Sequence, residues 1–232
     1  MIVTSTVSTR NQHKLSYWQR KKFNLPDHPV SEAFVLPKLA YIRKIIDIEP
    51  HYQLLDVGAG PGTFTYYFSR FIRTTAIDNS PEMVARSPCR DLIRLGNAEK
   101  MPFSDDSFDI VFSSNLLHHA DNPGQVLSEM RRVSKEFVVL VEPNRSNIPM
   151  FMFLLLVKEE RKGLVFSRRF LMDLARDCRL NTICCFSTGL IFQNMTPAFL
   201  IPLLKIFDAK IPFGAYTILI AKKERHVKDE KK

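Results

Sequence analysis

The ten residues LLDVGAGPGT, at positions 54–63, decide the fold of this chain. Four strand-like residues lead directly into three glycines spaced GxGxG. A glycine-rich turn between a strand and a helix lets a ligand approach the backbone at the carboxyl end of the strand. The stretch therefore predicts a ligand site at the edge of an α/β sheet, with a tight turn that binds nothing as the alternative.

Strand and helix patterns alternate along the rest of the chain. Helical periodicity predicts a helix at 63–73 and a leading helix near 35–46, and capping residues predict helix starts at Ser80, Asn122 and Ser167. The further apolar runs of strand length are 74–77, 92–95, 108–112, 137–141, 182–186 and 215–221. Repeated strand–helix units predict an α/β fold with a doubly wound, mostly parallel, seven-stranded sheet, helices on both faces and added apolar segments.

The composition is that of an ordinary globular protein, with 45% hydrophobic and 25% charged residues in 232, which excludes a disordered chain. The longest apolar run, 148–157, is far shorter than the roughly 20 residues that cross a bilayer. The first 14 residues contain no apolar signal region. A cytoplasmic location is therefore expected.

Basic residues are in excess, with 33 Lys and Arg against 24 Asp and Glu, a net charge of +9. Such an excess favours anionic partners. The sequence predicts a basic N-terminal cap over 1–34, a single α/β domain over 35–224 and a disordered basic tail over 225–232. Within the cap, residues 10–22 interleave Lys and Arg with Tyr17 and an adjacent tryptophan.

The residues around the glycine loop narrow the choice of ligand. A dinucleotide fingerprint GxGxxG would need glycine where Thr63 stands, and Asp56 suits a positively charged amino group better than a pyrophosphate. Asp78, at the end of the next predicted strand, can accept from two ribose hydroxyls. At the third strand, the Asn97 amide and the Ala98 backbone can bind a base. The predicted ligand is a nucleoside with a cationic tail and no phosphate.

Three segments, LLDVGAGPG, AIDNSPEMV and GNAEKMPFSDDSFDIVFSSNLLHHADNP, resemble successive motifs of the class I S-adenosylmethionine-dependent methyltransferases. The chain is similar to the group typified by the ubiquinone/menaquinone-biosynthesis C-methyltransferases over about residues 35–143. The resemblance implies a Rossmann-like methyltransferase sheet, the cofactor S-adenosyl-L-methionine and the product S-adenosyl-L-homocysteine. It also implies that the cofactor is bound by Asp56, Gly58, Ala59, Gly60, Gly62, Asp78, Asn79, Met83, Asn97, Ala98, Glu99, Asn115 and Leu116.

In that implied site, the glycine loop and Asp56 flank the methionine part, and Asp78 takes the ribose. Asn115 and Leu116 lie beside the methionine carbons and the sulfonium. The family usually has Asp where this chain has Asn97. An amide oxygen still accepts from the adenine amine, so a changed affinity is expected rather than a loss of binding.

The candidate general bases are His119 and, less favourably, His118, which follow the fourth predicted strand at the ligand edge. The alternative is that both histidines pack or cap that loop. Arg145, after the fifth predicted strand, is a candidate for binding a substrate carboxylate or phosphate. The cysteines and histidines show no metal-binding spacing, and no metal is expected.

Two interpretations of the acceptor compete. In the first, residues 146–166 and 193–212 form a lid over a small hydrophobic or anionic molecule, and Lys158, Arg161, Lys162 and Lys205 rest on an anionic membrane surface. In the second, residues 10–22, with Tyr17 contacting the substrate, bind RNA. A subunit that binds the cofactor without catalysis, and a nicotinamide oxidoreductase, are the weaker alternatives.

Overall fold

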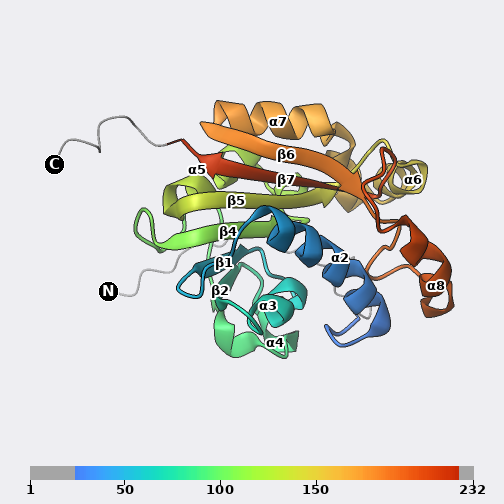
Figure 1. Ribbon diagram of the computed structural model, residues 1–232, viewed down its shortest axis with the longest axis horizontal. Helices are drawn as coiled ribbons and strands as arrows, with labels where there is room; N and C mark the ends of the chain where they lie inside the picture. The colour runs from blue at the N-terminus through green and yellow to red at the C-terminus, as the bar shows by residue number, and fades with distance from the viewer. Residues whose placement is uncertain (1–23, 225–232) are drawn as a thin grey trace.

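A single seven-stranded sheet forms the centre of the computed structural model, which describes residues 24–224 (Figure 1). Its strands lie in the order β3-β2-β1-β4-β5-β7-β6. In chain order they are β1 (Gln53–Val57), β2 (Arg73–Asp78), β3 (Ile93–Leu95), β4 (Phe108–Ser114), β5 (Ser134–Pro143), β6 (Leu180–Thr188) and β7 (Tyr216–Lys223).

Short helices connect the strands. The α-helices are α2 (Pro29–Ile45), α3 (Thr63–Phe68), α4 (Pro81–Arg86), α5 (Pro123–Val133), α6 (Ile148–Leu156), α7 (Arg168–Asp177) and α8 (Ile201–Leu204). The 3₁₀ turns are η1 (Arg90–Leu92), η2 (Leu117–His119), η3 (Lys158–Val165), η4 (Ala198–Leu200) and η5 (Lys205–Phe207).

The predicted seven-stranded α/β sheet is confirmed, and it is mixed. Strands β3, β2, β1, β4 and β5 pair in parallel, whereas β7 is antiparallel to both β5 and β6. The strand order reverses at β1, whose neighbours are β2 and β4. Ligands of open α/β sheets bind at the carboxyl ends of the strands at such a reversal, which here is where the glycine loop begins.

Each face of the sheet carries its own hydrophobic core. On one face, β-strand residues such as Leu54 and Phe112 pack with α2, α3 and α6. On the other, their neighbours Leu55 and Val111 pack with α5 and α7. Successive side chains of a strand point to opposite faces, so apolar runs without polar alternation are the pattern of a sheet covered on both sides.

The helix starts expected at Ser80, Asn122 and Ser167 are confirmed, since each side chain accepts from a backbone N–H in the first turn. The first helix after the glycine loop is shorter than expected. It ends at Phe68 rather than near residue 73, because the chain tightens into 3₁₀-type bonds, with the Phe71 N–H donating to Phe68 O at 3.0 Å, and then enters β2. The leading helix begins at Pro29, so residues 29–34 already pack with the domain.

The core between β4 and α3 gives the first prediction. The Phe112 side chain is fully buried, and its ring lies 4.7 Å from Phe64 and 4.9 Å from Phe68, centroid to centroid. Phe112→Ala should therefore lower the free energy of unfolding by about 3–5 kcal/mol, measured by urea denaturation. Phe199→Ala, at a side chain 79% exposed, should change it by less than about 0.5 kcal/mol. Equal losses in both variants would contradict this core.

Candidate functional site

The glycine loop between β1 and α3 is built from left-handed backbone. Gly58, Gly60 and Gly62 have φ of 71°, 55° and 80°, a region that side chains disfavour. A Cβ on Gly58 would lie 2.7 Å from Leu116 Cδ1, and one on Gly62 would lie 2.7 Å from Cys89 Sγ. Among residues 24–224, a Cβ on Gly60 would meet no neighbouring atom within 4 Å. Two glycines are therefore needed for packing, while the third faces open space.

The Asp78 carboxylate holds the glycine loop against the next loop. Its Oδ2 accepts from the Gly60 N–H at 2.7 Å, and its Oδ1 accepts from the Ser80 N–H at 2.9 Å. Burial raises the pKa of Asp78, and these backbone N–H donors oppose the rise. A carboxylate offers about four acceptor positions, so two remain for a diol.

The Asp56 side chain is buried under the loop. Its Oδ2 accepts from the Thr65 hydroxyl at 2.7 Å, which fixes the first turn of α3 beneath the glycines. Burial raises the pKa of Asp56 to about 7, against the lowering effect of that hydrogen bond. A cation at the loop would favour the charged carboxylate.

The residues expected around a base lie on the loops after β2 and β3. Asn79 is exposed, while Met83 and Ala98 are half-buried. The Asn97 Oδ1 accepts from the Glu99 N–H at 2.9 Å, and the Glu99 Oε1 accepts from the Asn122 N–H at 3.2 Å. The amide oxygen of Asn97 thus already forms a local turn and has one further acceptor position.

The loop after β4 brings Asn115 and Leu116 to the glycines. Asn115 has a left-handed φ of 54°, and its N–H donates to Val141 O at 2.8 Å. The Leu116 side chain packs where a Gly58 Cβ would stand. The backbone N–H groups of Leu116 and Leu117 both donate to Glu142 Oε1, at 3.1 and 2.9 Å. Glu142 therefore fixes the loop that carries both predicted cofactor residues.

The same glutamate begins a buried chain of charged groups. Glu142 Oε2 lies 2.6 Å from His118 Nδ1, and Glu160 Oε2 lies 3.2 Å from His118 Nε2. Burial alone would lower the pKa of His118, but Glu142 and Glu160 outweigh it and raise that pKa to about 9. A buried, protonated imidazole held at both nitrogens does not suit a general base, so the structure favours the packing interpretation for His118.

His119 is the more accessible histidine, with 31% of its side chain exposed. Its Nε2 lies 3.6 Å from Glu160 Oε1. Ligand-type atoms of His118, His119 and Glu160 lie within 4.8 Å of one another. The Arg145 side chain is exposed, and its Nη1 donates to Leu164 O at 3.0 Å. Tyr17 lies outside the described residues.

Glu142 and Glu160 are the site residues that sequence reasoning missed. Glu142 directly follows an apolar strand run, where a buried carboxylate signals a functional or structural partner. Glu160 carries no such signal, because it lies 42 positions from His118 in a charged stretch.

Residues 55–141 match the protein family described as a methyltransferase domain. The chain is 31% identical over 102 residues to an uncharacterized methyltransferase of Schizosaccharomyces pombe, covering 36% of each protein. It is 31% identical over 107 residues to the uncharacterized methyltransferase YcgJ of Bacillus subtilis, covering 42% of each. The chain thus spans well under two thirds of the length of either relative.

Solved structures share the fold over a much larger part of the chain. A Thermotoga maritima S-adenosylmethionine-dependent methyltransferase superimposes with a TM-score of 0.65 at 19% identity, covering 93% of this chain and 97% of that one. The Haloferax volcanii chain solved with the methyltransferase activator Trm112 gives a TM-score of 0.62 at 19% identity, covering 84% and 92%. The chain thus shares the fold of solved S-adenosylmethionine-dependent methyltransferases, and its residues 55–141 match the methyltransferase domain family.

The buried His118 gives the second prediction. Its folded-state pKa of about 9 exceeds the ordinary 6.5, so its contribution to stability is complete below pH 6.5 and is lost as the pH rises through 9. The stability advantage of the wild type over His118→Gln should therefore shrink between pH 6.5 and pH 9.5, by on the order of 2–3 kcal/mol.

Urea unfolding of both proteins at the two pH values measures this change, and titratable groups that do not contact His118 cancel in the comparison. A pH-independent difference between wild type and His118→Gln would mean that the imidazole is neutral.

Proposed function

We propose that this protein is an S-adenosylmethionine-dependent methyltransferase that acts on a small, apolar acceptor. The observation that carries the proposal is the position of Gly60. Its N–H donates to the Asp78 carboxylate, and it lies at the point where the strand order reverses, with space beside it among the described residues. Among the described residues, nothing neighbours the outer face of the loop at Gly60, and a loop that bears no side chain there can act as a cradle for a ligand. The ligand's chemistry follows from the acids around it, which suit a cationic tail and a ribose.

The residues present fit this cofactor. Asp78 retains acceptor positions for the ribose hydroxyls, and Asp56 favours a cation near the loop. Leu116 covers Gly58, beside the expected position of the methionine carbons. Of the remaining predicted contacts, Met83 lies on α4, and the others lie on the loops that follow β1 to β4 (Ala59, Asn79, Asn97, Ala98, Glu99 and Asn115).

When bound, the cofactor supplies an electrophilic methyl group. The protein then has to hold the acceptor in line with it, an effect worth up to about 7–11 kcal/mol. His119 is the side chain proposed to remove a proton from an acceptor hydroxyl or carbon acid. Arg145 is proposed to steer an anionic group of the acceptor, although its backbone contact to Leu164 also serves the fold.

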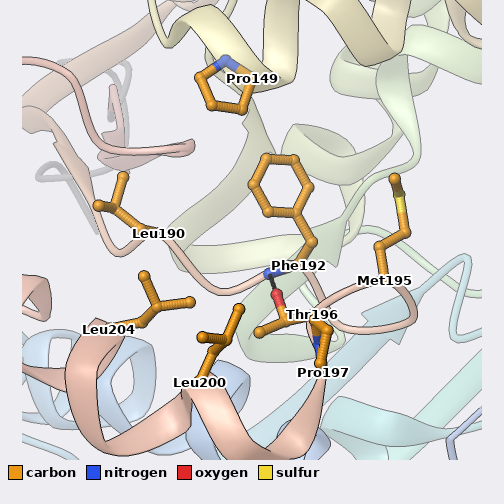
Figure 2. Close-up of a pocket in the computed structure, with 8 residues that line it drawn as sticks. All are labelled: Pro149, Leu190, Phe192, Met195, Thr196, Pro197, Leu200 and Leu204. Carbon is orange, nitrogen blue, oxygen red and sulfur yellow. Dashed lines mark hydrogen bonds between the residues drawn. The ribbon is translucent and has the colours of Figure 1, made fainter.

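The acceptor class follows from an apolar pocket of about 270 Å³ (Figure 2). It is lined by Pro149, Leu190, Phe192, Met195, Thr196, Pro197, Leu200 and Leu204. Figure 2 shows these side chains around the pocket, on α6, the loop after β6, η4 and α8, and the Thr196 hydroxyl accepts from the Phe192 N–H at 2.8 Å. A pocket with so few polar groups selects an apolar molecule.

The pocket wall is joined to the glycine-loop region. Gln193, from the same loop, donates through Nε2 to the Thr63 hydroxyl at 2.7 Å. The Phe192 ring lies 6.1 Å from that of Tyr216, which in turn lies 5.0 Å from Phe34. These contacts support the proposed lid over 146–166 and 193–212. The acceptor proposed for the apolar pocket is of the class to which prenylated quinone precursors belong. Residues 10–22, on which RNA binding would depend, lie outside the described residues.

Cofactor binding gives the third prediction. Gly60→Ala should fold, because a Cβ there meets nothing, but it should weaken S-adenosylhomocysteine binding more than about tenfold, since the new methyl occupies the ligand's place. Isothermal titration calorimetry measures this affinity.

Gly189→Ala is a matched control for backbone strain. Gly189 also has a left-handed φ, 67°, and room for a Cβ, but it lies in the loop after β6. Both variants should lose about 1–2 kcal/mol of stability, while only Gly60→Ala loses affinity. Equal affinities in the two variants would contradict the proposed cradle.

The pocket gives the fourth prediction. Leu200 lines it, whereas Leu203, on the neighbouring α8, is 60% exposed and does not. Leu200→Trp should fill the pocket and lower kcat/KM for an alkylated or prenylated phenol more than about tenfold, with labelled S-adenosylmethionine as methyl donor. Leu203→Trp should leave kcat/KM unchanged, and S-adenosylhomocysteine affinity should be the same in both. Similar activity in both variants would place the acceptor elsewhere.

A further inference from the structure

The outer face of α6 is unusually apolar for a surface helix. Residues 148–156 read IPMFMFLLL, with no polar or charged side chain, yet only Met150 and Leu154 are buried. Ile148 is 77% exposed and Leu156 is 70% exposed. A helix that is apolar on all sides is normally buried, so the exposed side of α6 lacks the polar face of an ordinary surface helix.

A second apolar face lies next to it, on η4, α8 and η5. Phe199, Leu203 and Ile206 are 79%, 60% and 68% exposed. The two faces adjoin, because Pro149 of α6 and Leu200 of η4 line the same pocket. Both helices lie at the same end of the molecule, the right side of Figure 1. Contiguous apolar surface of this kind marks an interaction site.

The charges on these segments are mainly positive. Lys158 and Arg161 directly follow α6, and Lys205 and Lys210 follow α8, all four with exposed side chains. The acids among them, Glu159, Glu160 and Asp208, are half-buried or buried. Apolar side chains bordered by lysine and arginine match the interface of an anionic bilayer, whose headgroups attract basic residues and whose acyl chains accept apolar ones.

We propose that the α6–α8 face docks this protein on an anionic membrane surface, with the apolar side chains in the headgroup region and the basic residues at the phosphates. Among the described residues, no helix is long and apolar enough to span a bilayer, so the contact is peripheral. A second copy of the chain fits this face less well. A symmetric dimer would place the basic borders of both copies against each other, and like charges at an interface repel.

The location of the face has a functional consequence. The apolar pocket lies between the two docked helices, and its wall is joined to the glycine-loop region through Gln193 and Thr63. An apolar acceptor could then pass from the bilayer into the pocket without entering water. The docking itself rests on the exposed face and not on the proposed methyl transfer, so either can fail alone.

Vesicle co-sedimentation of the full chain tests the proposal. The probes are vesicles of phosphatidylcholine alone and vesicles that also contain roughly 30% phosphatidylserine. The wild type should bind the anionic vesicles much more tightly, and raised salt should weaken that binding. Lys158→Glu/Lys205→Glu should lower the affinity for anionic vesicles more than about tenfold, since each basic residue near the surface contributes and each is reversed.

The apolar part is tested separately. Leu156→Glu/Phe199→Glu should lose most vesicle binding, because two carboxylates replace inserted apolar groups. Ile183→Glu is the matched control, since Ile183 is 47% exposed but lies on β6, away from the face, and it should bind like the wild type. Circular dichroism confirms that each variant is folded.

Three results would overturn the proposal. The first is an absence of wild-type binding to anionic vesicles, and the second is equal loss in Ile183→Glu and in the face variants. The third is a dimer in light scattering that Leu156→Glu/Phe199→Glu dissociates without vesicles, which would assign the face to a second copy.

Discussion

The Asp78 carboxylate is the group on which the arrangement of the site depends. It ends β2, and its two oxygens accept from the backbone of two different loops, at Gly60 and at Ser80. These bonds hold the glycine loop next to the start of α4. Glycine has more backbone freedom than other residues, so the loop needs such a contact to keep one conformation. Because the carboxylate is buried, its own ionisation costs free energy, and a ligand that donates to it would recover part of that cost.

A second set of buried charges connects the cofactor edge with the added segments. The Glu142 carboxylate accepts from the backbone N–H of Leu116 and so fixes the loop after β4. His118 lies between Glu142 and Glu160 of η3 and bonds to both carboxylates. The segment that carries α6 is thereby fixed to the loop that covers Gly58. Such a buried network is costly when incomplete, so a change at Glu160 would be felt at the cofactor edge as well as in the lid segment.

The α/β fold and the position of the glycine loop between β1 and α3 could be predicted because their signals are local. Strand-length apolar runs, capping residues such as Ser80 and the GxGxG spacing each report on a few adjacent residues. The reversed direction of β7 and the contact of Glu160 with His118 could not be predicted, since both depend on how distant segments return to the sheet. The predicted length of the helix after the glycine loop, 63–73, was wrong for a similar reason. The apolar periodicity continues past Phe68, but the chain must already turn toward β2 there.

The central claim is that the glycine loop and Asp78 form a site for a nucleoside sulfonium. The most direct test is retention of tritiated S-adenosylmethionine on the wild type and on Asp78→Asn, with Asp91→Asn, at a side chain 98% exposed, as the matched control. The account predicts retention by wild type and Asp91→Asn that S-adenosylhomocysteine displaces and NADH does not, and none by folded Asp78→Asn. Displacement by NADH, or undiminished retention by Asp78→Asn, would contradict it.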